Sequence, residues 1–245
     1  MNKKKRYKKR ILKYNMNTII YDFGIMHLLS FLFYELLTYY HIESIFLGNL
    51  GFNLTRSVIC GSLAYTSYIN LNKIYNDKCL LNENFNNDLI IYHHNFLNYF
   101  YYDIFVMAYQ VYKNINKKIR YDLLFHHILA IFVLNLIDYN KMYNITILIG
   151  LSEGMSFVSG FKLISHKLNE IKMKKIFIYI RLLYLIFIRL IFLWPSLILF
   201  YNDITNECDK FKNNKNITLL LFLLSMIIYN EFKWIQSGLK EIKRI

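Results

Sequence analysis

Residues 176–201 read IFIYIRLLYLIFIRLIFLWPSLILFY, an apolar run whose only charged residues are Arg181 and Arg189. About 18 or more consecutive apolar residues are enough for a helix to cross the hydrocarbon core of a bilayer. The backbone polar groups of a spanning segment must also find partners without water, and a helix supplies them within itself. The run therefore predicts a transmembrane helix, which contains the chain's one proline, Pro195.

Apolar blocks of this kind recur along the 245-residue chain, in which 56% of the residues are hydrophobic. The short alternating segments of a transmembrane β-barrel are absent from the sequence. The other predicted spans cover residues 19–40, 45–70, 96–111, 122–137, 145–164 and 217–235.

These blocks predict an all-α fold, a polytopic membrane helix bundle of six to seven transmembrane helices around an intramembrane cavity. We divide the chain into a basic tail at 1–18, an N-terminal transmembrane segment at 19–43, a membrane domain at 44–240 and a charged tail at 241–245. We expect no cleavable signal peptide, because the first apolar block is too long and no small-residue cleavage site follows it.

The formal net charge of +14 comes from Lys and Arg residues in the N-terminal tail and the loops. This distribution is typical of cytoplasmic segments of a membrane protein, so we expect no nucleic-acid partner. The basic loops 112–121 and 165–175 share one side with the C-terminus if spans four to seven all cross. Seven crossings would place the basic tail at 3–10 on the opposite side, so either the first segment does not cross or the tail departs from the rule.

The three cysteines give two expectations. Cys60 lies within a predicted span, and we expect it to be inert. Cys79 and Cys208 fall in loops that four spans separate, so they share one side of the membrane. A lumenal disulfide between them is one interpretation.

Charged residues inside apolar spans are costly, and they usually face the interior of a bundle and mark a path or a site. Both signs are present, so buried pairing of Arg56 or Arg189 with an acidic residue is the purely structural alternative. The charged or titratable residues within the spans are Glu35, Arg56, Asp103, His126, His127, Glu153, Lys162, Arg181, Arg189 and Glu231.

The adjacent histidines His126 and His127 are the most specific feature of these spans. Neighbouring helical residues point about 100° apart, so both side chains can border one cavity. Asp122 precedes His126 by one turn on the same face, where a contact would fix the imidazole tautomer. The pair could serve as a general base, an acyl-accepting nucleophile or a metal ligand. We expect no metal, because adjacent histidines lack the i,i+4 spacing of two ligands on one ion.

Further polar residues share helix faces with one another. Tyr99 and Asp103 are four residues apart on the third span, and Glu153 and Ser156 are three apart on the fifth. Together with the histidines they place polar groups on three helices, enough to line an intramembrane cavity. A second histidine pair, at 93 and 94, lies in a polar segment and is predicted to be at the surface.

The order of these motifs resembles the TLC domain family, which includes ceramide synthases and translocation-associated membrane proteins. The similarity extends over residues 50–238, and no single run carries it. The runs are Asn53-Leu-Thr-Arg56, Asn98-Tyr-Phe-Tyr-Tyr-Asp103, His126-His127, Glu153-Gly-Met-Ser156-Phe157-Val158, Phe187-Ile-Arg189 with Pro195, and Asn230-Glu-Phe-Lys-Trp234.

The resemblance implies an integral protein of the endoplasmic reticulum or another endomembrane that binds or processes lipid acyl chains in membrane lipid homeostasis. For acyl transfer, with acyl-CoA as co-substrate, it implies a catalytic set and a substrate-binding set. The catalytic set is His126, His127, Asp103 and Glu153. The substrate-binding set is Tyr99, Arg56, Ser156 and Arg189.

The chain also departs from the family. Ser62 stands where relatives often carry a histidine, and the His-Asp-x-x-Asp element of ceramide synthases does not follow the histidine pair. The resemblance therefore favours the branch that does not make ceramide. The alternative is a non-catalytic lipid-sensing, chaperone or cargo-receptor protein of the secretory pathway, which could form a homo-oligomer. A transporter is less favoured, because only one proline interrupts the helices.

Overall fold

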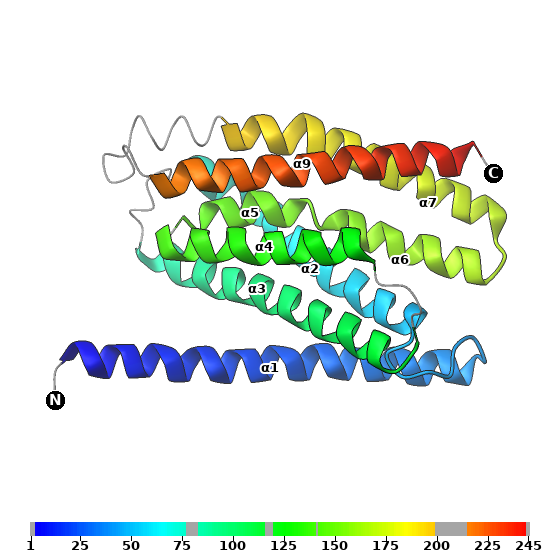
Figure 1. The fold of residues 1–245 in the computed structure, drawn as a ribbon, viewed down its shortest axis with the longest axis horizontal. Coiled ribbons are helices and arrows are strands. Elements are labelled where there is room, and N and C mark those ends of the chain that lie inside the picture. The colour runs from blue at the N-terminus through cyan, green and yellow to red at the C-terminus, as the bar shows by residue number, and fades with distance from the viewer. Residues whose placement is uncertain (1–2, 77–82, 116–119, 141, 199–214, 244–245) are drawn as a thin grey trace.

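The computed structural model describes residues 3–76, 83–115, 120–140, 142–198 and 215–243 (Figure 1). Within these ranges the regular structure is helical, without strands, which confirms the all-α class. The elements are α1 (Lys3–Tyr39), α2 (Asn49–Asn76), α3 (Glu83–Tyr112), α4 (Tyr121–Asn140), α5 (Asn144–Leu151), α6 (Gly154–Lys167), α7 (Ile171–Tyr184), the π-helix η1 (Leu185–Leu193) and α9 (Lys215–Ile242).

The helices lie side by side in one bundle, with α1 along one side and α7 and α9 along the other (Figure 1). The C-terminal end of α3, the N-terminal end of α4, the α6–α7 connection and the C-terminal end of α9 lie at one end of the bundle, which we call the basic end. The N-terminus lies at the opposite end. The predicted basic loops thus share an end, and the basic tail at 3–10 does not.

Four helices are long and apolar enough to cross a membrane, judged by length and composition over the described residues. They are Ile19–Tyr39, Tyr121–Tyr139, Asn144–Lys167 and Ile171–Ile198. Six to seven spans were expected, and four meet this criterion. Only 11% of the first span is buried, so α1 packs at the edge of the bundle against α2 and α3.

The hydrophobic core lies where α2, α3, α4 and α5 meet. Its large members are almost fully buried, among them Phe96, Phe100, Leu134, Ile137 and Ile147. The same region contains buried polar residues from each of these helices, so the core is apolar packing built around a polar centre. Cys60 is also buried there as a free thiol. Cys79 and Cys208 lie outside the described residues.

The predicted fifth span is interrupted. Residues 152–153 form a turn between α5 and α6, where a continuous helix was expected. The predicted sixth span also departs from a regular α-helix, because it continues from α7 into the π-helix η1. π-helical turns are rare and occur frequently at functional sites.

Gly150 allows α5 to pack closely against its neighbours. A Cβ at this position would collide with the hydroxyl groups of Tyr92 and Ser67, which lie 2.7 Å apart in a hydrogen bond. We expect Gly150→Ala to lower the free energy of unfolding by about 1–3 kcal/mol, because the well-packed core must shift. Thermal unfolding of the purified protein in detergent measures this. Gly24→Ala is the control, since a Cβ there meets no atom within 4 Å. Equal stability of Gly150→Ala and Gly24→Ala would contradict the close packing of α5 at Gly150.

Candidate functional site

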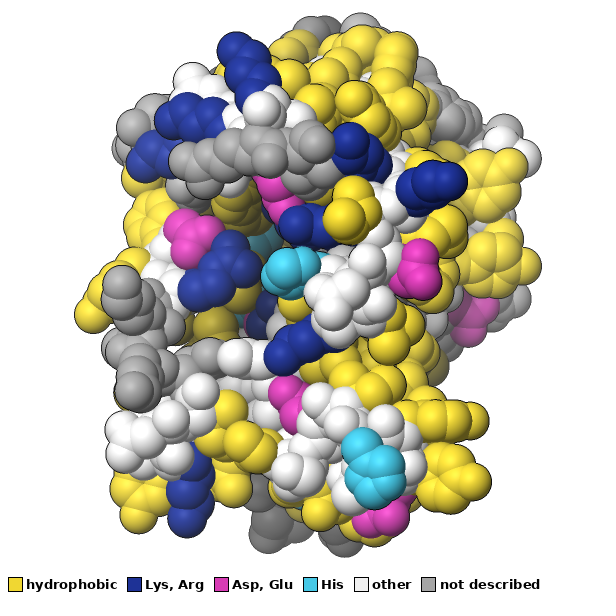
Figure 2. Space-filling view, turned by 90° about the vertical axis from the view of Figure 1, so that its right-hand side faces the viewer, with side chains coloured by type: hydrophobic (Ala, Val, Ile, Leu, Met, Phe, Trp, Pro, Cys, Tyr) yellow, Lys and Arg dark blue, Asp and Glu magenta, His cyan; other side chains and the backbone are white. Residues whose placement is uncertain are grey.

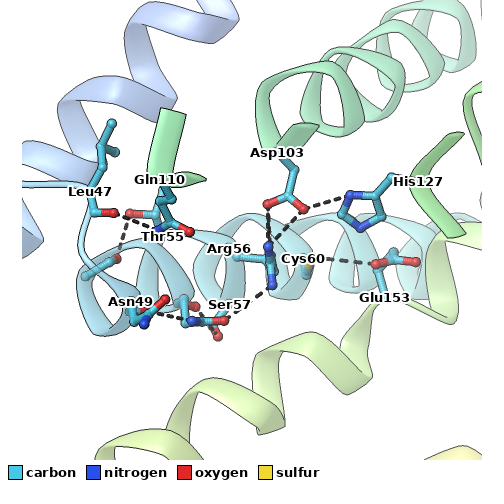
Figure 3. Close-up of polar contacts among 12 residues, drawn as sticks. Leu47, Asn49, Thr55, Arg56, Ser57, Cys60, Asp103, Gln110, His127 and Glu153 are labelled. Atoms are coloured by element: carbon cyan, nitrogen blue, oxygen red, sulfur yellow. Dashed lines mark hydrogen bonds and ion pairs between the residues drawn. The ribbon is translucent and has the colours of Figure 1, made fainter. Parts of the chain in front are cut away.

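Asp103 joins a buried chain of charged side chains from three helices (Figure 3). Its carboxylate accepts two hydrogen bonds from Arg56 of α2, from Nε to Oδ1 at 2.9 Å and from Nη2 to Oδ2 at 3.0 Å. Oδ2 also lies 2.8 Å from Nδ1 of His127 on α4. Asp103 is completely buried and His127 is 2% exposed. One carboxylate therefore compensates the Arg56 guanidinium and lies within ion-pair distance of an imidazole, whose Nδ1 does not meet hydrogen-bond geometry.

Local contacts on α2 hold the Arg56 side chain in place. Asn53, one turn earlier, accepts a hydrogen bond from Arg56 Nη1 at 3.3 Å. The guanidinium also lies over the ring of Phe52, 4.9 Å from its centroid. Positions three and four residues apart share a helix face, so the sequence of α2 already favours these contacts. Together with Asp103 they engage three guanidinium nitrogens.

His126 points to a different neighbourhood from His127. Its ring packs against Trp234 of α9 at 5.1 Å and against Phe100 at 6.3 Å between centroids. It borders a cavity of about 20 Å³ that Ser152 and Glu153 also line. This volume has room for about one water molecule. Nδ1 of His126 is buried without a hydrogen-bond partner among the described residues.

The turn between α5 and α6 leaves backbone carbonyls to be satisfied, because the last carbonyls of a helix have no donor within it. Side chains from α7 and η1 supply the donors. The Tyr184 hydroxyl donates to the Leu151 carbonyl. Arg189 donates from Nε and Nη2 to the Ser152 carbonyl, at 2.9 and 2.7 Å. The interruption is thus stabilised inside the bundle.

Glu153 lies beside this interruption, between Arg189 and the polar centre. Oε1 is 3.7 Å from Arg189 Nη2. Oε2 accepts a long contact from the Cys60 thiol, at 3.7 Å. Cys60 follows Arg56 by one turn of α2, so the thiol connects the region of Glu153 to that of Arg56 (Figure 3).

A larger cavity of about 420 Å³ lies between α2, α3 and α4. Such a volume is within the range of small-molecule sites. Arg56 lines it together with Arg120, the amide side chains Asn49, Asn53 and Gln110, and the apolar residues Phe52, Ile104, Met107, Ala108, Val111, Leu123 and Leu124. We call it the α2–α4 cavity. Its lining includes the last residue of α3 and the first turn of α4, so it lies toward the basic end.

The predicted site residues therefore fall into two groups. Arg56, Asp103 and His127 form the buried ion-pair chain, and the Tyr99 ring packs on His127 at 6.3 Å. His126, Glu153 and Arg189 form the second group, at the turn between α5 and α6. The pairing of Arg56 with Asp103, one of the pairings that the sequence allows, is confirmed.

Three details differ from the sequence predictions. Asp122, which was expected to contact His126, forms an ion pair with Arg120 at 2.8 Å. Ser156 contributes its backbone carbonyl, which accepts a hydrogen bond from Ser57 at 2.9 Å. The surface prediction for His93 was wrong. It is fully buried, with Nδ1 2.8 Å from the Thr146 hydroxyl.

The sequence predictions assigned no site role to Cys60 or Asn53. Their only signal is helical spacing, since Asn53, Arg56 and Cys60 follow one another at three- and four-residue intervals along one face of α2. Trp234 was marked only through the family resemblance. Comparisons of the chain with family models, with curated proteins and with solved structures find no match.

Proposed function

We propose that the protein is a TLC-type membrane protein that binds a lipid with its acyl chain in the α2–α4 cavity. In this proposal α2, α3 and α9 complete a bundle of seven spans, and the cavity opens within the membrane. The single observation that carries the proposal is the cavity of about 420 Å³ with Arg56, the ion-pair partner of the buried Asp103, in its wall.

The chemistry of the cavity lining supports an amphiphilic occupant. Apolar side chains from three helices suit a hydrocarbon chain, while Arg56 and the amides can hydrogen-bond ester or amide oxygens. A few polar groups in a mostly apolar cavity are the usual composition of a ligand site, because the apolar area supplies affinity and the polar groups supply orientation.

The contact between His127 and Asp103 supports acyl transfer as the reaction. A proton shared between Nδ1 and Asp103, which lie 2.8 Å apart, would leave Nε2 as the base. Nε2 would take the proton of the acceptor's hydroxyl or amine as that group attacks the acyl carbonyl. The proton would then pass to the leaving group, the thiolate when acyl-CoA is the donor. The reaction would contribute to membrane lipid homeostasis, and we place it in the endoplasmic reticulum or a related membrane.

The burial of His127 supports the second candidate, a non-catalytic lipid sensor, chaperone or cargo receptor. With 2% of its side chain exposed, the imidazole has no open path to a substrate in this conformation. The Arg56–Asp103–His127 chain would then serve to fix the relative positions of α2, α3 and α4. Lipid binding in the α2–α4 cavity is common to both candidates.

Filling the cavity tests the shared step. Ala108 lines the cavity and is exposed, so Ala108→Trp can occupy the space without overpacking the core. We expect about a tenfold loss of labelling of α2–α4 by a diazirine-bearing phosphatidylcholine in nanodiscs, because the bulky ring excludes the chain. Peptide mass spectrometry locates and quantifies the label.

Phe105→Trp is the matched control, because Phe105 is exposed on the same helix and does not line the cavity. It should label like the unmodified protein. Equal labelling of the unmodified protein and Ala108→Trp would show that no lipid occupies the cavity.

A further inference from the structure

The Arg181 side chain on α7 is charged, and not all of its hydrogen-bond donors are paired. Its Nε is buried and has no hydrogen-bond partner among the described residues. A buried donor on a charged group is costly to leave unpaired. The charged residues that face Arg181 are Glu241 of α9, Arg120 just before α4, and Arg189 of η1. Two of these three neighbours are also cations.

The neighbouring charges are already engaged with other partners. Glu241, the carboxylate that faces Arg181, binds Lys162 of α6 at 2.8 Å. Arg120 is paired with Asp122 at 2.8 Å. Where α7 packs against α6 and α9, Lys162 and Arg181 therefore share one carboxylate, and Lys174 of α7 adds a further positive charge nearby.

The basic end of the bundle adds to this positive potential. Lys and Arg side chains gather around a hollow on this face (Figure 2). Lys167, Lys172 and Lys175, around the connection of α6 with α7, are exposed. Positive charge next to a membrane attracts anionic headgroups over about a Debye length. An anion is therefore drawn toward this end of the bundle, where Nε of Arg181 is unpaired among the described residues.

We propose that Arg181 and Lys162 form a binding site for a phosphate group. The planar guanidinium matches the oxygen spacing of phosphate and can bond it through two parallel N–H groups. A phosphomonoester carries up to two negative charges, which suits a site with two cations and one carboxylate. The source of the phosphate is either a lipid headgroup at the membrane surface or free phosphate.

Lys162 and Arg181 do not line the α2–α4 cavity, although Arg120, which faces Arg181, does. The inference does not depend on the proposed lipid-binding function, and either can fail without the other. It adds an anion-recognition site formed by α6, α7 and α9, where the sequence by itself shows only lysine and arginine side chains near span ends.

Lipid retention in native mass spectrometry tests the site. The full chain is released from nanodiscs of phosphatidylcholine that contain or lack phosphatidic acid. We expect phosphatidic acid to be retained preferentially, and Arg181→Gln to weaken its retention about tenfold, because a bidentate charge-assisted contact is lost. Lys175→Gln removes the same charge from an exposed site on the same helix and should have little effect. Equal losses in both variants would overturn the proposal, because they would indicate general surface attraction.

Two further measurements keep the test decisive. Arg181→Lys keeps the charge and loses the planar fork, so an intermediate loss is expected even if Arg181→Gln folds poorly. Added inorganic phosphate distinguishes the sources. Displacement of phosphatidic acid by phosphate alone indicates a free-phosphate site, and no displacement indicates a lipid headgroup site. If the unmodified protein retains phosphatidic acid no better than phosphatidylcholine and is not stabilised by phosphate, the proposal is wrong.

Discussion

Asp103→Leu is expected to lower the free energy of unfolding by about 3–5 kcal/mol, more than any other single substitution proposed for this protein. The Arg56 guanidinium would lose both hydrogen bonds to the carboxylate while its side chain stays 12% exposed. An uncompensated charge in a low-dielectric interior is strongly unfavourable. His127 would lose its contact at Nδ1 as well. Thermal unfolding in detergent should show a fall in Tm on the order of 10 °C.

The double variant Arg56→Met with Asp103→Leu separates charge balance from packing. Replacing a whole buried ion pair by apolar side chains is often neutral, whereas removing one partner is not. We therefore expect the double variant to recover most of the stability that Asp103→Leu loses. If Asp103→Leu alone unfolds at the temperature of the unmodified protein, the buried pair does not exist in solution. If the double variant is as unstable as the single one, the loss comes from packing.

His127→Gln is expected to reduce acyl transfer by about 100- to 10,000-fold, the usual contribution of a positioned general base. Glutamine keeps a polar group near Asp103 but cannot take up a proton. His126→Gln should have a smaller effect, because the ring of His126 packs on Trp234 and borders the small cavity at Glu153. Incorporation of a labelled fatty acyl chain into cellular lipids, followed by lipid mass spectrometry, measures the reaction.

His93→Gln is the matched control for this experiment. His93 is also a fully buried histidine, but its contact is with Thr146 on α5. His93→Gln also replaces a buried histidine but leaves the proposed site untouched. Acyl incorporation should therefore not change beyond the change in protein level. An unchanged lipid profile in His127→Gln at normal expression would exclude catalysis by this residue. Retained lipid labelling of the α2–α4 cavity in that case would support the non-catalytic candidate.

The two experiments also constrain each other. The double variant of Arg56 and Asp103 removes the group that orients His127, and it is expected to be folded. If acyl transfer depends on an oriented base, this variant should be stable and nearly inactive. A stable and fully active double variant would show that Asp103 has a structural role only.

Helix class and the identity of the polar core residues could be predicted because both are local properties. Hydrophobic runs of spanning length need only the chain itself. Where these runs fall within the described residues, they are mostly helical. Buried Arg56, Asp103, His127, Glu153 and Arg189 were singled out because charge in an apolar run is conspicuous. The turn at 152–153 was not predicted, because no proline marks it. Its carbonyls are satisfied by Tyr184 and Arg189, which are more than thirty residues away in the chain.

Which polar groups meet was decided by tertiary packing. From the sequence, Asp122 was expected to contact His126 because of its spacing on one helix, and Asp103 was assigned to the catalytic set. In the folded chain Asp122 pairs with Arg120, and Asp103 crosses from α3 to both Arg56 and His127. The rotation and depth of each helix determine such contacts, and these depend on how core side chains from four helices interlock. The sequence alone therefore determined a helical chain suited to a membrane and a short set of costly polar residues, whereas tertiary packing divided that set into a charge-paired centre and a stabilised helix interruption.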